Sequence, residues 1–238
     1  MKKEQAFERK NMTAALLCGM LGCVCFGVGD WLMIYGDTAY SGSVYWLTEG
    51  AAEIPAWRNA MAMGLAFPGI VLYGIALFAI EKFLRRERHR KVYRGLTAFG
   101  LTPWLCLHLF YIMILYVFAW LRGNGQAALP AAEALYSHLS WIVPLSEAIM
   151  LPPYLYWFWA VASGKSHLPK KMAVSNPLIF YAVLRLVQAF LPAGPFRIGF
   201  TNGLMSESMA FWFISLLALA RRRGVNHTQP LKNERNPI

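Results

Sequence analysis

The sequence predicts an all-α membrane protein, a polytopic bundle of six transmembrane helices with both termini in the cytoplasm. Of its 238 residues, 57% are hydrophobic and only 15% are charged, and the mean hydropathy is +0.39. Apolar runs long enough to cross a bilayer recur along the chain. Of the 23 Lys and Arg residues, 19 lie in the N-terminal arm, two alternate connectors and the C-terminal tail, where the positive-inside rule places cytoplasmic segments.

The hydropathy pattern divides the chain into three expected parts. They are a cytoplasmic arm over residues 1–12, a transmembrane domain over residues 13–220 and a basic tail over residues 221–238, which we expect to be disordered. The six helices are expected at residues 13–35, 60–80, 96–121, 138–162, 172–191 and 198–220.

The net charge of +11 follows from this topology, and we expect no nucleic-acid partner, because the basic runs are short connectors between spans. The expected partner is the lipid bilayer, with anionic headgroups facing the basic segments. The apolar run after Lys10 is too long for a cleaved signal, so it is interpreted as a retained first helix. These features predict a multi-pass protein of a bacterial plasma membrane, and they are compatible with an oligomer.

The first helix carries small residues at a spacing of four, such as Cys18 and Gly22, and such a surface lets another helix approach closely. All four cysteines lie within expected helices, so we interpret them as packing residues rather than as disulfide partners or metal ligands. The second helix contains Pro68, which predicts a kink because proline removes one backbone hydrogen bond.

The connector over residues 81–94 contains seven Lys or Arg residues and is the strongest orientation signal. The fourth helix contains Pro144 and the pair Pro152-Pro153, which predicts a bent or broken segment. Such a segment is tolerated at membrane depth where its backbone lines a cavity or packs on protein. Asn176, followed by a proline, begins the fifth helix.

Polar residues from five of these helices are expected at similar depth in the outer half of the membrane, whereas the inner half is expected to be nearly all apolar. They are Asp30, His108, Glu147, Arg185, Gln188, Asn202 and Glu207. At a rise of about 1.5 Å per residue, Asp30 lies about 8 Å below the outer end of its helix. Because charged residues in a bilayer usually face the bundle interior, we expect the set to line one outward-facing polar cavity, with Asp30 pointing inward.

The charges of this set favour a cationic ligand. Its three acids face one permanent cation, Arg185, while His108 can carry part of a charge. An acid left unpaired in a low dielectric takes up a proton or binds a cation. The sequence therefore predicts binding or transport of a small cationic or amphipathic molecule. We expect no metal site and no cofactor, because no HExxH, Walker A, paired CxxC or dinucleotide motif occurs.

Two other functions remain open at this point, and catalytic residues cannot be assigned from sequence. An intramembrane enzyme could act on a lipid or polyprenyl substrate, with His108 and Glu147 exchanging protons. A structural assembly protein could dock a partner on the small residues of the first helix. Each polar residue could also be satisfied by local interhelical hydrogen bonds alone.

Short motifs are spread over most of the chain. They are Gly29-Asp30 with Tyr35, His108-Leu109-Phe110, Lys170, Asn176-Pro177 and Thr201-Asn202-Gly203. In these motifs the chain resembles a family of uncharacterised bacterial multi-pass membrane proteins. The resemblance implies six helices and intramembrane polar residues at Asp30, His108, Asn176 and Asn202, and it implies no particular activity.

Overall fold

A computed structural model describes residues 2–34, 54–125 and 128–226, so Tyr35 and most of the expected tail lie outside the described residues. The described chain is helical and contains no strand. Its α-helices are α1 (Lys2–Ile34), α2 (Ala56–Ala79), α3 (Glu87–Gly123), α4 (Leu129–Leu139), α5 (Ile142–Ile149), α6 (Leu151–Ala162), α7 (Pro177–Ala189) and α8 (Pro195–Asn226). Short 3-10 helices, η2 (Ile80–Phe83) and η4 (Lys170–Val174), follow α2 and precede α7.

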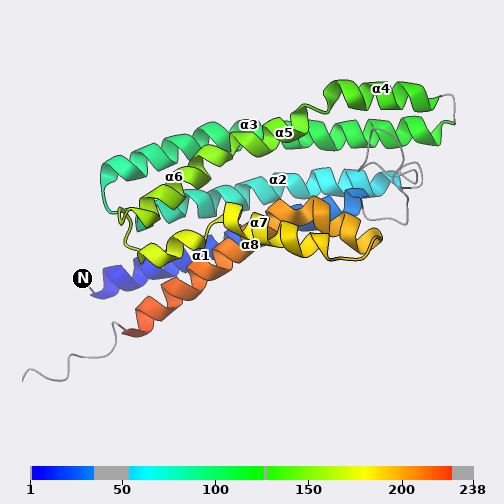
Figure 1. Ribbon diagram of the computed structural model, residues 1–238. Coiled ribbons are helices and arrows are strands. Elements are labelled where there is room, and N and C mark those ends of the chain that lie inside the picture. Colours follow the sequence, from blue (N-terminus) through cyan, green and yellow to red (C-terminus); the bar gives the residue numbers. More distant parts are fainter. Residues whose placement is uncertain (1, 35–53, 126–127, 227–238) are drawn as a thin grey trace, which may run out of the picture.

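The long segments run in alternate directions along one axis, and α4, α5 and α6 follow one another beside α3 (Figure 1). The beginning of α1 and the end of α8 lie at the same end of the bundle (Figure 1). Within the described residues, four helices are long and apolar enough to cross a membrane. These stretches are Lys10–Ile34, Ala56–Phe83, Glu87–Leu121 and Pro195–Arg221. The all-helical, membrane-type fold class is therefore confirmed.

The helices extend further than hydropathy predicts. The expected arm is part of α1, much of the basic connector over residues 81–94 is the first part of α3, and α8 continues to Asn226. The expected outer connector over residues 122–137 is also largely helical, because α4 begins at Leu129. Hydropathy marks only the apolar part of a helix, whereas Lys, Arg and Glu are themselves good helix formers.

The expected break in the fourth segment is confirmed, because α5 and α6 are separate helices on either side of Met150. The break packs closely on α3. A Cβ atom at Gly100 would lie 2.8 Å from the carbonyl oxygen of Ile149. A glycine on α3 thus leaves room for the backbone where the neighbouring segment changes direction.

The small residues of α1 allow close packing, as predicted. A Cβ at Gly22 would lie 2.9 Å from the carbonyl oxygen of Gly69 on α2, and a Cβ at Gly19 would lie 2.5 Å from the Cβ of Ala76. The α2 helix continues through Pro68, so its backbone stays close to α1 over a long stretch. The α1 helix also packs along α8.

The basic connectors before α3 and after α6 meet at one end of the bundle, which we call the basic end. Leu84 and Ser166 form an isolated antiparallel bridge, and the Arg85 side chain donates from Nε to the Ser166 carbonyl oxygen at 2.7 Å. Nearby, Arg94 donates from Nε to the Glu81 carboxylate at 2.8 Å. The first two contacts fasten the α2–α3 and α6–η4 connectors to each other, and the Arg94–Glu81 pair joins α3 to η2.

Candidate ligand-binding cavity

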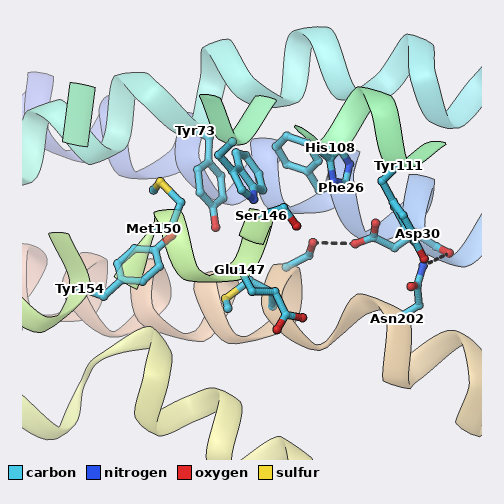
Figure 2. A pocket seen from close by; sticks show the side chains of 13 residues that line it. Phe26, Asp30, Tyr73, His108, Tyr111, Ser146, Glu147, Met150, Tyr154 and Asn202 are labelled. Atoms are coloured by element: carbon cyan, nitrogen blue, oxygen red, sulfur yellow. Dashed lines mark hydrogen bonds between the residues drawn. The ribbon is translucent and has the colours of Figure 1, made fainter. Parts of the chain in front are cut away.

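A cavity of about 110 Å³ lies inside the bundle, at the level of the break between α5 and α6. Its walls come from α1, α2, α3, α5, α6 and α8, and Met150 at the break is one of its lining residues. Figure 2 shows the polar side chains converging on it from several helices. Residues far apart in the sequence therefore form a single site, which we call the Asp30 cavity.

Asp30 lies on α1 and is only 7% exposed. The hydroxyl of Ser206 donates to its Oδ2 at 2.9 Å, and the Asn202 side-chain amide donates to its main-chain oxygen at 2.8 Å. Asn202 and Ser206 are four residues apart and so share one face of α8. The expectation that Asp30 points into the bundle is confirmed by these contacts (Figure 2).

The packing of Trp31 brings α1 and α8 into this register. Gly199 and Gly203 form a groove on α8 for its indole, and a Cβ at Gly199 would lie 2.6 Å from the ring. The indole Nε1 of Trp31 donates to Oε1 of Glu207 at 3.4 Å. With Trp31 seated in this groove, the next residue toward the N-terminus, Asp30, faces Ser206.

His108 belongs to an aromatic wall opposite α8. Its ring stacks on Trp104 at 5.5 Å between centroids and meets Phe26 edge-on at 5.2 Å. Trp104 in turn stacks on Tyr73 of α2. The electron-rich faces of such rings attract cations within about 6 Å, so this wall and the Asp30 carboxylate favour the same type of ligand.

Glu147 lies on α5, and its side chain lines the cavity although the residue is exposed at the surface. In Figure 2 its carboxylate is directed away from that of Asp30. Among the described lining residues, the acids are Asp30 and Glu147 and none is Lys or Arg. The charge that the lining supplies is therefore negative, and a proton or a cation would neutralise it.

The structure brings four of the expected site residues to the cavity lining: Asp30, His108, Glu147 and Asn202. Arg185, Gln188 and Glu207 are not part of that lining. Arg185 is exposed on α7 and donates to Oε1 of Gln188 at 3.3 Å, while the Gln188 amide donates to Thr201 at 2.7 Å. Gln188 therefore fastens α7 to α8. Depth along a helix placed these residues at the right level, but it does not specify which way they face.

Other lining residues were not selected by depth and charge, among them Tyr73, Tyr111, Ser146 and Tyr154. Tyr111 could have been predicted from the sequence as a lining residue. Trp104, His108 and Tyr111 are spaced by four and three and so share one face of α3. Figure 2 shows Tyr111 extending toward Asp30 and Asn202. Tyr73 and Tyr154 carried no such signal, since aromatic residues fill many positions in apolar helices.

The inner half of the bundle is less apolar than expected. Tyr93, Thr97, Ser175 and Asn176 are all buried between the Asp30 cavity and the basic end. Asn176 caps α7 by accepting from the Leu178 amide, and it donates to the Tyr154 carbonyl oxygen at 3.0 Å. Hydropathy averages over a window, so single polar groups in an apolar helix leave little trace in it.

The described residues contain no group of three or more His, Cys, Asp or Glu side chains placed to hold a metal ion. Asp30, His108 and Glu147 line the same cavity, yet they do not converge as ligands of one ion. The described cysteines are free thiols. The chemistry that the lining itself supplies is hydrogen bonding, negative charge and aromatic surface.

Comparison with known proteins places the chain in an uncharacterised family. The model of a family of unknown function (DUF6796) matches residues 1–223. No curated protein matches the chain, and no solved structure matches it. The resemblance to an uncharacterised family is thus confirmed.

Proposed function

The chain belongs to this family of unknown function, and we propose that it is a membrane protein that binds a small cation, or the cationic head of an amphipathic molecule, in the Asp30 cavity and carries it across the bilayer. The observation that carries the proposal is that a buried carboxylate and an aromatic wall line the same cavity. Intramembrane acids are costly and mark ion and substrate pathways.

The size of the cavity limits the ligand. Its volume of about 110 Å³ holds several water molecules, and it is smaller than the roughly 150 Å³ engineered cavity that accepts benzene. A partly hydrated inorganic cation or a small alkylammonium group fits this space. An amphipathic ligand would place only its charged head there.

The lining residues have different roles in the proposed binding. The Asp30 carboxylate supplies the counter-charge, and Ser206 holds one of its oxygens. The rings of Phe26 and Trp104 line the same cavity, so an ammonium group there can contact an aromatic surface. Glu147, exposed at the surface and lining the same cavity, offers a first point of contact for an arriving cation.

The broken segment supports transport rather than binding alone. Met150 separates α5 from α6 and lines the cavity, and discontinuous helices at membrane depth are a recurrent feature of transporter binding sites. In the proposed topology, α4 to α6 form one crossing and η4 with α7 another. With the four long helices these make six crossings, with both termini and the basic end on the cytoplasmic side of a bacterial plasma membrane.

The test is a binding measurement on purified protein in lipid nanodiscs. Alkylammonium ions of increasing volume, from methylammonium to tetraethylammonium, would be titrated by calorimetry, with neutral alcohols of matched size as controls. We expect saturable binding of the small cations and a loss of about tenfold or more in Asp30→Asn, since tenfold corresponds to only about 1.4 kcal/mol. Glu133→Gln removes an exposed acid of α4 outside the lining and should bind normally. Equal affinity in Asp30→Asn and wild type would refute the proposal.

A second candidate is an intramembrane enzyme acting on a lipid or polyprenyl substrate. The observation in its favour is that His108 and Glu147 line the same cavity, as a proton donor and acceptor would. The small volume counts against it unless only the substrate's head enters. Turnover of a lipid by wild type and its loss in Glu147→Gln, with cation binding unchanged, would favour this alternative.

A further inference from the structure

A second and larger cavity, of about 360 Å³, lies between the beginning of α2 and the end of α3. This position is at the end of the bundle away from the basic end (Figure 1). Its volume falls in the range of about 300–1,000 Å³ that is typical of small-molecule sites. None of its described lining residues belongs to the Asp30 cavity.

Asn59 provides a polar group in this cavity that the fold itself does not use. It lines the cavity and is only 2% exposed. Within the described residues its Oδ1 is buried and accepts no hydrogen bond. Buried side-chain acceptors are nearly always paired in folded proteins, so an external donor in the cavity would meet an unfilled requirement.

The beginning of α2 offers backbone hydrogen-bond donors beside the acceptor Asn59 Oδ1. Its N-cap is Pro55, which makes no side-chain capping bond, and Ala56 at the first helical position lines the cavity. The first backbone N–H groups of an α-helix have no i→i−4 partner; that of Arg58 donates to the Pro55 carbonyl oxygen at 2.9 Å, so the donors in question are those of Ala56 and Trp57. A ligand that both donates to Asn59 and accepts from this helix end would satisfy both groups.

Aromatic side chains form the wall contributed by α3. Tyr116 and Trp120 are four residues apart, so they share a face, and Trp120 is 61% exposed. The described lining contains no charged side chain. A charged ligand would therefore find no counter-charge, whereas the apolar C–H face of a sugar ring can rest on an indole or a phenol.

We propose that this cavity binds a neutral, hydroxyl-rich group, namely a sugar, either free or as the headgroup of a glycolipid. Its hydroxyls donate to Asn59 Oδ1 and accept from the N-terminal backbone of α2, and its ring stacks on Trp120. The site is independent of cation binding at Asp30. Asp30→Asn should therefore leave it unchanged.

The experiment uses the full-length protein purified in a detergent without a sugar headgroup and reconstituted in phosphatidylglycerol–phosphatidylethanolamine nanodiscs. One arm titrates D-glucose, D-galactose and N-acetylglucosamine by calorimetry, with cyclohexanol as a ring lacking the hydroxyl set. The other arm adds monoglucosyl diacylglycerol to the nanodiscs and detects retained lipid by native mass spectrometry. Binding in the first arm identifies a free sugar, and binding only in the second identifies a glycolipid headgroup.

We expect Asn59→Ala and Trp120→Ala to weaken the observed binding at least tenfold, and Trp120→Phe to retain most of it because a ring remains. The matched control is Trp141→Ala, which removes an indole that is 54% exposed and lies outside this cavity. Thermal unfolding of each variant shows that it is folded. Absence of binding of all four sugar probes to wild type, or wild-type affinity in folded Trp120→Ala, would overturn the proposal.

Discussion

The half of the bundle around Asp30 and the half toward the basic end both bury polar side chains, but they surround them differently. Around Asp30 there is open space, and the carboxylate accepts a hydrogen bond from Ser206. Toward the basic end, polar atoms are enclosed by packed rings. Within the described residues, two side-chain nitrogens there are buried without a hydrogen-bond partner, Trp157 Nε1 and Trp212 Nε1.

These two nitrogens belong to indole rings that fill the core. The Trp157 ring lies 5.8 Å from Tyr93 and 5.7 Å from Trp212 between centroids, and all three residues have no exposed surface. A buried polar atom without a partner costs about 1–3 kcal/mol. Large aromatic side chains offset such a cost through the apolar area that they bury.

The two halves of the bundle therefore differ in whether a passage through them is open or closed. The Asp30 cavity has room and charge, whereas the segment between it and the basic end is filled by rings. Beyond the rings, the bridge between Leu84 and Ser166 joins the two connectors, and the Glu81–Arg94 ion pair holds η2 to α3. A carrier with this structure would have to separate these contacts to release its ligand on the basic side.

The largest expected effect comes from neutralising one carboxylate in each half. Asp30→Asn should weaken alkylammonium binding by about 100-fold, since losing one partner of a buried charge pair costs 2–5 kcal/mol. Glu81→Gln should leave binding within about twofold, because Glu81 is buried against Arg94 at the basic end, does not line the Asp30 cavity and is remote from it. Calorimetry in nanodiscs measures both. Similar losses in the two variants would mean that the halves are not functionally distinct.

Replacing a glycine of α1 by alanine adds one methyl group, and we expect the two halves to respond differently. A Cβ at Gly19 would lie 2.5 Å from Ala76 Cβ, but one at Gly27 would meet only Ser206 Cβ at 3.8 Å. Gly19→Ala should therefore lower the free energy of unfolding by about 1–3 kcal/mol through overpacking. Gly27→Ala should be neutral or stabilise by up to about 1 kcal/mol because alanine favours a helix. Unfolding in mixed micelles tests the pair, and equal stabilities would contradict the difference in packing.

Accessibility provides a third test. In a background without the four native cysteines, Ser146→Cys should react with a small, membrane-impermeant thiol reagent at least about ten times faster than Thr97→Cys, because a fully buried site reacts only after local opening. Ser146 lines the Asp30 cavity, whereas Thr97 has no exposed surface. Fast labelling of Thr97→Cys in the absence of ligand would show that the inner half is open.

The smallest expected effects concern two buried hydroxyls, one that donates to the Asp30 carboxylate and one that does not. Ser206→Ala removes the donor to Asp30 and should cost about 1 kcal/mol of unfolding free energy. Thr97→Val removes a hydroxyl whose polar neighbour is the Tyr93 hydroxyl, without a hydrogen bond of normal geometry, and should change the free energy of unfolding by no more than about 0.5 kcal/mol. Denaturant unfolding of both variants measures the difference. A larger loss in Thr97→Val would reveal a partner for its hydroxyl.

The sequence predicted particular features of this site well. The prolines of residues 138–162 indicated a broken segment, and Met150 at the break lines the cavity. Asp30 was expected to point inward, and it meets Ser206 on α8. Arg185 was expected beside the acids at the same depth. It lies within electrostatic reach of Glu147, but it is exposed on α7, donates to Gln188 and does not line the cavity. Its level along the helix was predicted, but its direction around the helix was not.

The sequence alone specifies the helical membrane class, the small-residue face of α1 and the level of each polar group along its helix. These properties are local, because a backbone in hydrocarbon must satisfy its own hydrogen bonds and depth follows from the rise per residue. Only the tertiary structure decided which polar groups meet. That choice depends on the rotation of each helix about its axis, which side-chain packing sets, as Trp31 does in the groove of Gly199 and Gly203.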